Sequence, residues 1–226
     1  AIAVKEWLIE TNTKGTIRFY GTPAEEGGSG KVYMVRAGLF DDVDAVLHWH
    51  PSSSNAANAE SSNSNKSAKF RFTGISAHAA GSPHKGRSAL DGVEAMNLMV
   101  NMMREHIPQE SRIHYVITKG GLAPNVIPDL AEVYYYVRHP KREKVQEIFN
   151  WVVEAAEGAA IGTQTKVSYE VMHGNYSKLP NQTLQKIMHK NLLSRGGIKY
   201  SQEENEYAKK IHKTLISPGG KIGDQE

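Results

Sequence analysis

The sequence predicts a chain of mixed class, α/β plus α+β, in which part of a parallel-sheet catalytic domain carries an inserted ferredoxin-like domain. Three features of the 226 residues support this. Strand and helix patterns follow one another as βαββαβ between residues 67 and 174. A strand–helix–strand pattern precedes them, within residues 1–66. A Ser/Asn-rich linker at 52–66 separates the two, and residues 175–226 are expected to return to the first domain.

The segment from Thr16 to Pro51 has the pattern of a βαβ unit. Its first part, TIRFYG, is a short β-rich run that ends at Gly21, and its last part, AVLHWH, is a second such run stopped by Pro51. Between them KVYMVRAG is a short helix closed by Gly38. Strands that alternate with a helix favour a parallel sheet.

The elements after the linker are regular. Alternating apolar residues predict four strands, and apolar residues at spacings of three and four predict two helices. In chain order these are a strand at 69–73, a helix at 87–106, strands at 113–118 and 131–138, a helix at 144–157 and a strand at 165–172. This is the order of the split βαβ, or ferredoxin-like, arrangement.

The two ends of the chain are helical in pattern. Residues 1–10 form an amphipathic helix that starts without a capping residue, so the chain is expected to be an internal piece of a longer protein. Residues 181–197 and 202–215 read as two further helices, the first stopped by glycines. No internal repeat is visible.

Composition excludes several classes of protein. The net charge of +3 is small and spread along the chain, so nucleic acid is not an expected partner. No apolar run approaches the roughly 20 residues that span a bilayer, so no membrane partner is expected. The chain has no cysteine, which excludes disulfides and thiolate metal sites and fits the reducing cytoplasm.

Two adjacent acids form the first candidate site. Glu25 and Glu26 lie in the Gly-rich segment GTPAEEGGSG, just after a predicted strand, where ligands bind in open α/β sheets. Adjacent carboxylates can divide two tasks, one binding a metal and the other moving a proton. A solvated loop carrying two acids is the alternative interpretation. A phosphate-binding loop is excluded, because no glycine stands five positions before Gly30.

Histidines form the next candidates. On a strand, His48 and His50 point to the same face, so either could reach a metal, or both could serve packing. His78 follows the strand at 69–73 among small residues, which would let a substrate or another chain approach its ring. By itself His78 is equally an exposed loop histidine.

Two further polar residues could hold a carboxylate. Asn125 lies between prolines in the loop GGLAPNVIP, and Arg138 stands at the end of a strand. Arginine binds carboxylates through two parallel hydrogen bonds. A turn asparagine and a surface ion pair are the plainer interpretations of the two residues.

Three long segments carry a resemblance to a known family. Residues 21–51, 70–97 and 120–140 are similar, in this order, to the two-metal metallopeptidase and amidohydrolase family of aminoacylases and glutamate carboxypeptidases. They resemble most the B-type branch of the aminobenzoyl-glutamate hydrolases. The resemblance extends from Thr16 to about Leu193 and identifies residues 67–174 as a lid and dimerisation domain.

The resemblance implies a role for each candidate. Glu25 would be the general base, Glu26 and His50 would be metal ligands, and His78 would stabilise the oxyanion, reaching into the site of a partner subunit. Asn125 and Arg138 would hold the substrate and its carboxylate. It also implies two divalent ions, zinc or manganese, in a homodimeric enzyme that hydrolyses an amide bond in an acyl-amino acid.

The family pattern is incomplete in this sequence. Segments that supply a first His, a bridging acidic or Cys ligand and a final His have no counterpart among the 226 residues, so this piece is expected to bind metal weakly or not at all. Two rival functions therefore stand beside the enzyme: a non-catalytic ferredoxin-like dimerisation module and a small-ligand-binding module.

Overall fold

The computed structural model describes residues 1–52 and 54–217. They form two compact units, Ala1–Asp42 with Ser64–Tyr176 and Val43–Asn63 with Ser177–Glu226, and each is described by itself. Residue 53 of the Ser/Asn-rich linker and residues 218–226 of the predicted third segment lie outside the described residues.

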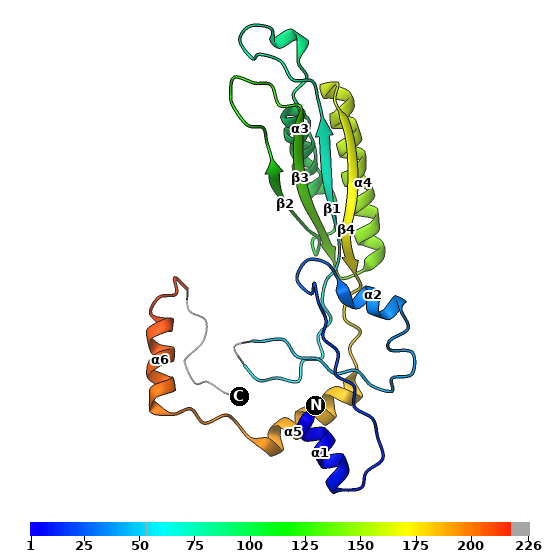
Figure 1. The fold of residues 1–226 in the computed structure, drawn as a ribbon, viewed down its shortest axis with the longest axis vertical. Coiled ribbons are helices and arrows are strands. Elements are labelled where there is room, and N and C mark those ends of the chain that lie inside the picture. Colours follow the sequence, from blue (N-terminus) through cyan, green and yellow to red (C-terminus); the bar gives the residue numbers. More distant parts are fainter. Residues whose placement is uncertain (53, 218–226) are drawn as a thin grey trace. The chain divides into compact units, whose positions relative to one another are not determined.

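An antiparallel four-stranded sheet is the centre of the first unit (Figure 1). Its strand order is β2-β3-β1-β4. Two helices pack against one face and leave the other face open. The chain order is β1 (Ser64–Thr73), α3 (Ala89–Met103), β2 (Arg112–Lys119), β3 (Leu130–His139), α4 (Arg142–Thr163) and β4 (Lys166–Asn175). The predicted mixed class and βαββαβ order are therefore confirmed.

The core lies between this sheet and the two helices. Alternate residues of β1 and β3 point into it, so Phe70, Phe72 and Tyr135 are fully buried. The rings of Phe70 and Tyr135 meet edge to face, with centroids 5.9 Å apart. The buried Tyr135 hydroxyl donates a hydrogen bond of 2.5 Å to Asn97 Oδ1 on α3, so neither polar atom is left unpaired.

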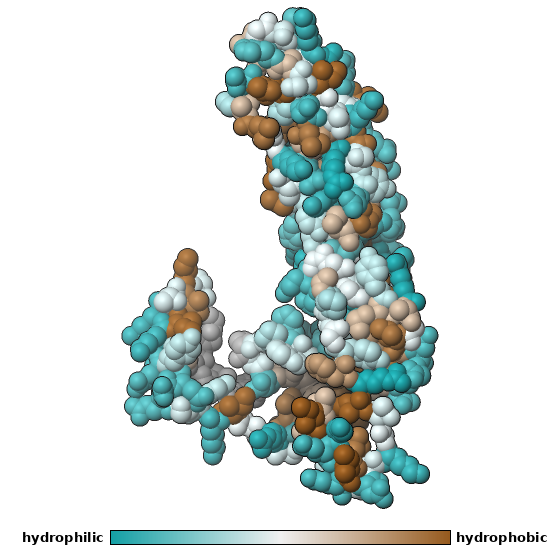
Figure 2. Space-filling view, in the orientation of Figure 1, coloured by the Kyte–Doolittle hydropathy of each residue, from teal (hydrophilic) through white to brown (hydrophobic). Residues whose placement is uncertain are grey.

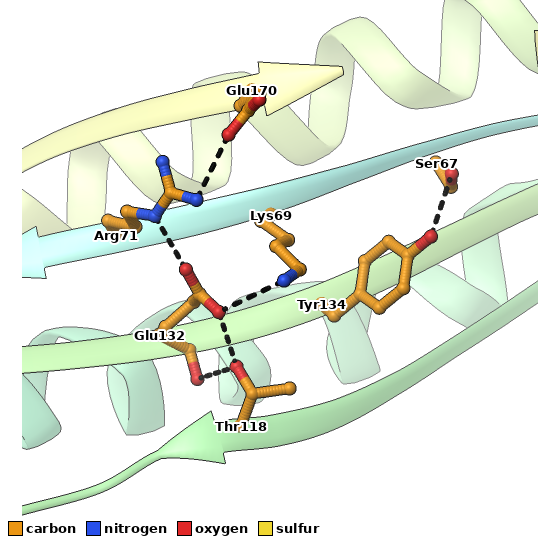
Figure 3. A network of polar contacts seen from close by, with 7 residues as sticks. All are labelled: Ser67, Lys69, Arg71, Thr118, Glu132, Tyr134 and Glu170. Atoms are coloured by element: carbon orange, nitrogen blue, oxygen red, sulfur yellow. Dashed lines mark hydrogen bonds and ion pairs between the residues drawn. The ribbon is translucent and has the colours of Figure 1, made fainter. Parts of the chain in front are cut away.

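The open face of the sheet is polar and partly shielded by its own side chains. Glu132 on β3 is only 4% exposed, and Arg71 Nε and Thr118 Oγ1 donate hydrogen bonds to its carboxylate at 2.5 and 2.8 Å (Figure 3). Lys69 Nζ lies 3.6 Å from the same carboxylate, and Arg71 also donates to Glu170 on β4. This network joins all four strands.

The first strand is longer than predicted. It begins at Ser64 rather than Lys69, within the segment interpreted as linker. Ser64 and Ser67 are buried, and both hydroxyls donate hydrogen bonds to backbone carbonyls, the former to His139 at 2.7 Å. Small hydroxyl side chains that satisfy themselves locally can enter a central strand, although their polarity gives no strand signal.

The predicted βαβ unit and its parallel sheet are wrong for the described residues. Of its three elements only the helix forms, as α2 (Gly30–Arg36). The segments 16–21 and 45–50 make no ladder, and Phe19 and Trp49 are 84% and 81% exposed. A strand exists only with a neighbour that pairs with its backbone groups, and no described segment supplies one here.

The remaining helices lie near the two ends. They are α1 (Ile2–Glu10), α5 (Gln182–Arg195) and α6 (Gln202–His212). As predicted, α1 has no side-chain cap, whereas α6 starts with a capping box between Ser201 and Glu204. None of the helices within the described residues is both long and apolar enough to cross a lipid bilayer.

Candidate functional site

The two acids lie in a tight turn before α2. Its backbone closes with a hydrogen bond of 3.0 Å from Gly28 N to Ala24 O, and Ala24 and Ser29 both take positive φ angles near 50°. A side chain at Gly28 would place its Cβ 2.7 Å from that of Ala24, so the turn needs glycine there. The turn presents Glu25 and Glu26 to solvent. We call residues 24–29 the acid turn.

The candidate metal ligand His50 belongs to the second unit. Its ring is exposed, and Nδ1 lies 2.8 Å from the carbonyl oxygen of Pro51. Glu26 belongs to the first unit, so the two candidate ligands are described separately. Among residues 1–52 and 54–217, no group of three or more His, Cys, Asp or Glu side chains could hold a metal ion. The described residues alone therefore do not form a metal centre.

His78 and Asn125 lie together at one end of the sheet. The loops that carry them are joined by a bridge between His78 and Val126 and by a hydrogen bond of 3.0 Å from Ala79 N to Asn125 O. His78 Nδ1 accepts hydrogen bonds from the backbone N–H groups of Ala80 and Gly81, at 3.2 and 2.9 Å. The proton of a neutral ring therefore resides on Nε2, and this exposed imidazole presents one outward N–H donor.

Arg138 lies at the other end of the sheet. Its guanidinium stands over the ring of Tyr136, 5.3 Å from the centroid. Its Nε is buried and has no hydrogen-bond partner in the part of the chain that the structure describes. A buried donor without a partner is rare in proteins and is readily satisfied by an anionic ligand. The observation favours the carboxylate-binding interpretation of Arg138 over a surface ion pair.

The candidates of the first unit thus divide between two ends of one sheet. Arg138 lies eight residues along β3 from Leu130, the residue that follows the Asn125 loop. At a rise of roughly 3.3 Å per residue this is about 26 Å. The acid turn belongs to the Arg138 end, because Ser29 Oγ lies 3.1 Å from His173 Nδ1. One sheet cannot bring His78 and Asn125 to the acids that it carries itself.

Three residues near Arg138 had no sequence signal. They form a hydrogen-bonded row in which Tyr136 on β3 contacts His173 on β4, and His173 contacts Ser29 of the acid turn. Burial and the hydroxyl of Tyr134 raise the pKa of Tyr136 to about 12, and the negative charge of Glu26 adds to this rise. The tyrosine is thus close enough to the acid turn to respond to its charge. A run of three tyrosines and a histidine at a strand end gave no motif to recognise.

An open groove of about 890 Å³ lies at the His78 end of the sheet. It is bordered by Arg87, Leu122 and Ile127, and neither His78 nor Asn125 lines it. The loops around it carry exposed apolar residues, including Leu122, and brown residues mark this end of the unit in Figure 2. The groove is separate from the acids and from Arg138, so hydrolytic chemistry is not assigned to it.

Comparisons with known proteins agree with this division of the molecule. Residues 61–164 match the M20 peptidase dimerisation domain. The B-type chain of p-aminobenzoyl-glutamate hydrolase from Escherichia coli (strain K12) is 48% identical over 218 residues, which are 96% of this chain and 45% of that protein. The Xaa-Arg dipeptidase of Mus musculus is 34% identical over 165 residues, which are 73% of this chain and 38% of that protein.

A solved structure gives the same picture. The crystal structure of an aminobenzoyl-glutamate utilization protein from Klebsiella pneumoniae matches with a TM-score of 0.58 and 25% identity, over 73% of this chain and 43% of that chain. The chain therefore spans less than half the length of these relatives.

The fold and these matches define the class of protein: the chain belongs to the M20 family of amidohydrolases and peptidases and carries its dimerisation domain. Within that family it is similar over nearly its whole length to the B-type chain of p-aminobenzoyl-glutamate hydrolase. The resemblance predicted from the sequence is confirmed.

Proposed function

We propose that this chain is part of a metal-dependent enzyme that hydrolyses the amide bond of an acyl-amino acid, with p-aminobenzoyl-glutamate or a related compound as substrate. The observation that carries the proposal is the 48% identity to one chain of a p-aminobenzoyl-glutamate hydrolase over 96% of this chain. We propose the cytoplasm as its location, in keeping with the absence of cysteine.

In this proposal Glu25 moves the proton. Its carboxylate is exposed on the acid turn, where it can accept a proton from the attacking water and pass it to the leaving amine nitrogen. Arg138 binds the free carboxylate of the substrate through the donors of its guanidinium. The free Nε of Arg138 supports this role.

His78 and Asn125 act on the substrate from a second chain. His78 donates from Nε2 to the oxyanion that forms when water attacks, and Asn125 helps to hold the substrate. The distance of about 26 Å along β3 supports a site shared between two chains, since these residues lie far from the acids of their own sheet. We propose a homodimer through the dimerisation domain, in which each chain completes the site of the other.

Two divalent ions, zinc or manganese, would lower the pKa of the attacking water toward about 7 when bound. Glu26 would supply a carboxylate ligand and His50 an imidazole ligand. Since the described residues contain no group of three such side chains, further ligands must complete the centre.

The experiment is hydrolysis of p-aminobenzoyl-glutamate by the complete gene product, with and without a chelator. We expect Glu25→Gln to lower kcat at least about a hundredfold, because a general base typically contributes two to four orders of magnitude. The matched control is Glu6→Gln, which changes another exposed acid in α1 and should leave kcat unchanged. Unchanged turnover in Glu25→Gln would refute the assignment.

The same assay decides between this function and the rival modules. A dimer that binds no metal and hydrolyses neither p-aminobenzoyl-glutamate nor dipeptides with C-terminal arginine would establish a dimerisation module. The dipeptides belong in the assay because one relative is an Xaa-Arg dipeptidase. Molar mass from light scattering gives the assembly. A monomer that becomes active only with a related second chain would replace the homodimer by a heteromer.

A further inference from the structure

One buried histidine on the open face of the sheet has no role in the proposed chemistry. His173 lies near the end of β4 and is 8% exposed. Both ring nitrogens are paired, Nε2 with the Tyr136 hydroxyl at 2.7 Å and Nδ1 with the Ser29 hydroxyl at 3.1 Å. Burying a titratable ring between two hydroxyls is unfavourable unless both bonds are made, so this residue is held in one orientation.

The position of His173 depends on a β-bulge. Upstream of it, Ala68 on β1 pairs with Val171, but the next residue of β1, Ser67, pairs with His173. Met172 is therefore the extra residue in β4. The bulge turns His173 to the open face, where its ring meets that of Tyr136 edge to face with centroids 5.1 Å apart.

The hydrogen bonds of this row run in one direction. The Tyr134 hydroxyl donates to the Tyr136 oxygen at 3.4 Å, so the Tyr136 hydroxyl proton is free to go to His173 Nε2. A neutral imidazole that accepts at Nε2 carries its proton on Nδ1 and donates to Ser29 Oγ. Burial, and then the positive charge of Arg138, lowers the pKa of His173, which agrees with this neutral form.

The two ends of the row lie at the proposed machinery. Ser29 ends the acid turn three residues after Glu26 and is the N-terminal cap position of α2, with φ of 52°. Tyr136 stands two residues before Arg138 on the same face of β3, beneath its guanidinium. One imidazole therefore links the backbone that carries the acids to the ring that supports the arginine.

We propose that His173 is a positioning residue, which fixes the acid turn relative to Arg138 through Ser29 and Tyr136. The inference rests on the proposed function, in which Arg138 anchors the substrate while Glu25 moves the proton. Because a displacement of about 1 Å can lower a rate a hundredfold, a rigid link between the two groups has direct value for the reaction.

The test uses four variants of the complete gene product. His173→Leu removes both bonds, and His173→Gln keeps an acceptor for Tyr136 and a donor for Ser29. Ser29→Ala and Tyr136→Phe each remove one bond with little change in volume. The control Tyr169→Phe removes a hydroxyl from β4 on the helix-covered face, and His106→Gln replaces an exposed histidine far along the chain.

Two quantities are measured: kcat and KM for p-aminobenzoyl-glutamate, and amide hydrogen exchange of residues 24–36. We expect His173→Leu to lower kcat about 10- to 100-fold, as for residues that orient a ligand, while KM changes less than about threefold because Arg138 remains. Exchange in the acid turn should accelerate. His173→Gln should restore most of kcat, and Ser29→Ala should add little to His173→Leu.

Equal kcat and unchanged exchange in His173→Leu would overturn the inference and leave the proposed function intact. Equal losses in His173→Leu, His173→Gln and Tyr169→Phe would overturn it too, since a general loss of stability would then explain them. A wild-type protein without hydrolysis would instead overturn the proposed function. The exchange measurement would then decide by itself whether His173 holds the acid turn.

Discussion

Replacing Glu132 by glutamine tests whether the polar network of the open face stabilises the fold. The carboxylate is 4% exposed and accepts charge-assisted hydrogen bonds from Arg71 and a hydrogen bond from Thr118. Bonds to charged groups contribute about 1.5–3 kcal/mol and neutral ones about 0.5–1.5 kcal/mol. Glutamine keeps the shape but weakens each of two bonds by about 1 kcal/mol. We therefore expect Glu132→Gln to lower the free energy of unfolding by about 2 kcal/mol.

The assay is urea unfolding of the chain, followed by circular dichroism at several pH values. Burial alone would raise the pKa of Glu132, but the hydrogen bonds from Thr118 and Arg71 and the positive charge of Lys69 outweigh it and hold the pKa below its usual value. The ionised form therefore stabilises the fold above the unfolded pKa of about 4.3, and this contribution disappears as the pH falls through the lower folded pKa. Wild type and Glu132→Gln should differ at pH 7 and converge in strong acid.

The matched control is Glu170→Gln. Glu170 bonds to the same arginine at 3.0 Å, but its side chain is 56% exposed, so water replaces the lost interaction. We expect a change below about 0.5 kcal/mol there. A loss of less than about 0.5 kcal/mol in Glu132→Gln, or a loss that is the same at pH 7 and in strong acid, would refute the reasoning.

Three further outcomes are expected. Gly92→Ala places a Cβ 2.4 Å from Phe72 Cδ1, so the free energy of unfolding should fall by about 1–2 kcal/mol although alanine favours helices, and a higher urea midpoint would contradict the packing. Tyr135→Phe leaves Asn97 Oδ1 buried without its donor and should cost about 1–2 kcal/mol in the same assay; no loss would mean that water reaches this site. Since its pKa is lowered, His173 should make the fold less stable as the pH falls below about 6.5, and His173→Gln should flatten that part of the stability profile measured by thermal unfolding.

The first unit was predictable because its signals are local. Alternation in β1 and β3 and the three- and four-residue spacing of apolar side chains in α3 fix each element's type, and their order then fixes the ferredoxin-like topology. The start of β1 was missed because buried serines such as Ser64 look like loop residues.

The segments around Phe19 and Trp49 show the limit of this reasoning. They have the composition of strands, yet a strand requires a neighbour to pair with its backbone, and composition does not reveal whether one is present. The same holds for the candidate site. Residue types and motifs suggested Arg138 and the acid turn, but the separation of Arg138 from His78 follows from strand register, which became visible only in the fold.

The bulge at Met172 has a consequence for how β4 could change in length during evolution. In an unbroken ladder Met172 would pair with Ser67, and residue 173 would then pair with Lys66 and turn toward the helices. The bulge confines the extra residue to one position, so His173 keeps Ser67 as its partner and stays on the open face. A β4 one codon shorter at this point would give the histidine the same partner. An insertion or deletion at position 172 could therefore pass through the lineage while the link between the acid turn and Arg138 was retained.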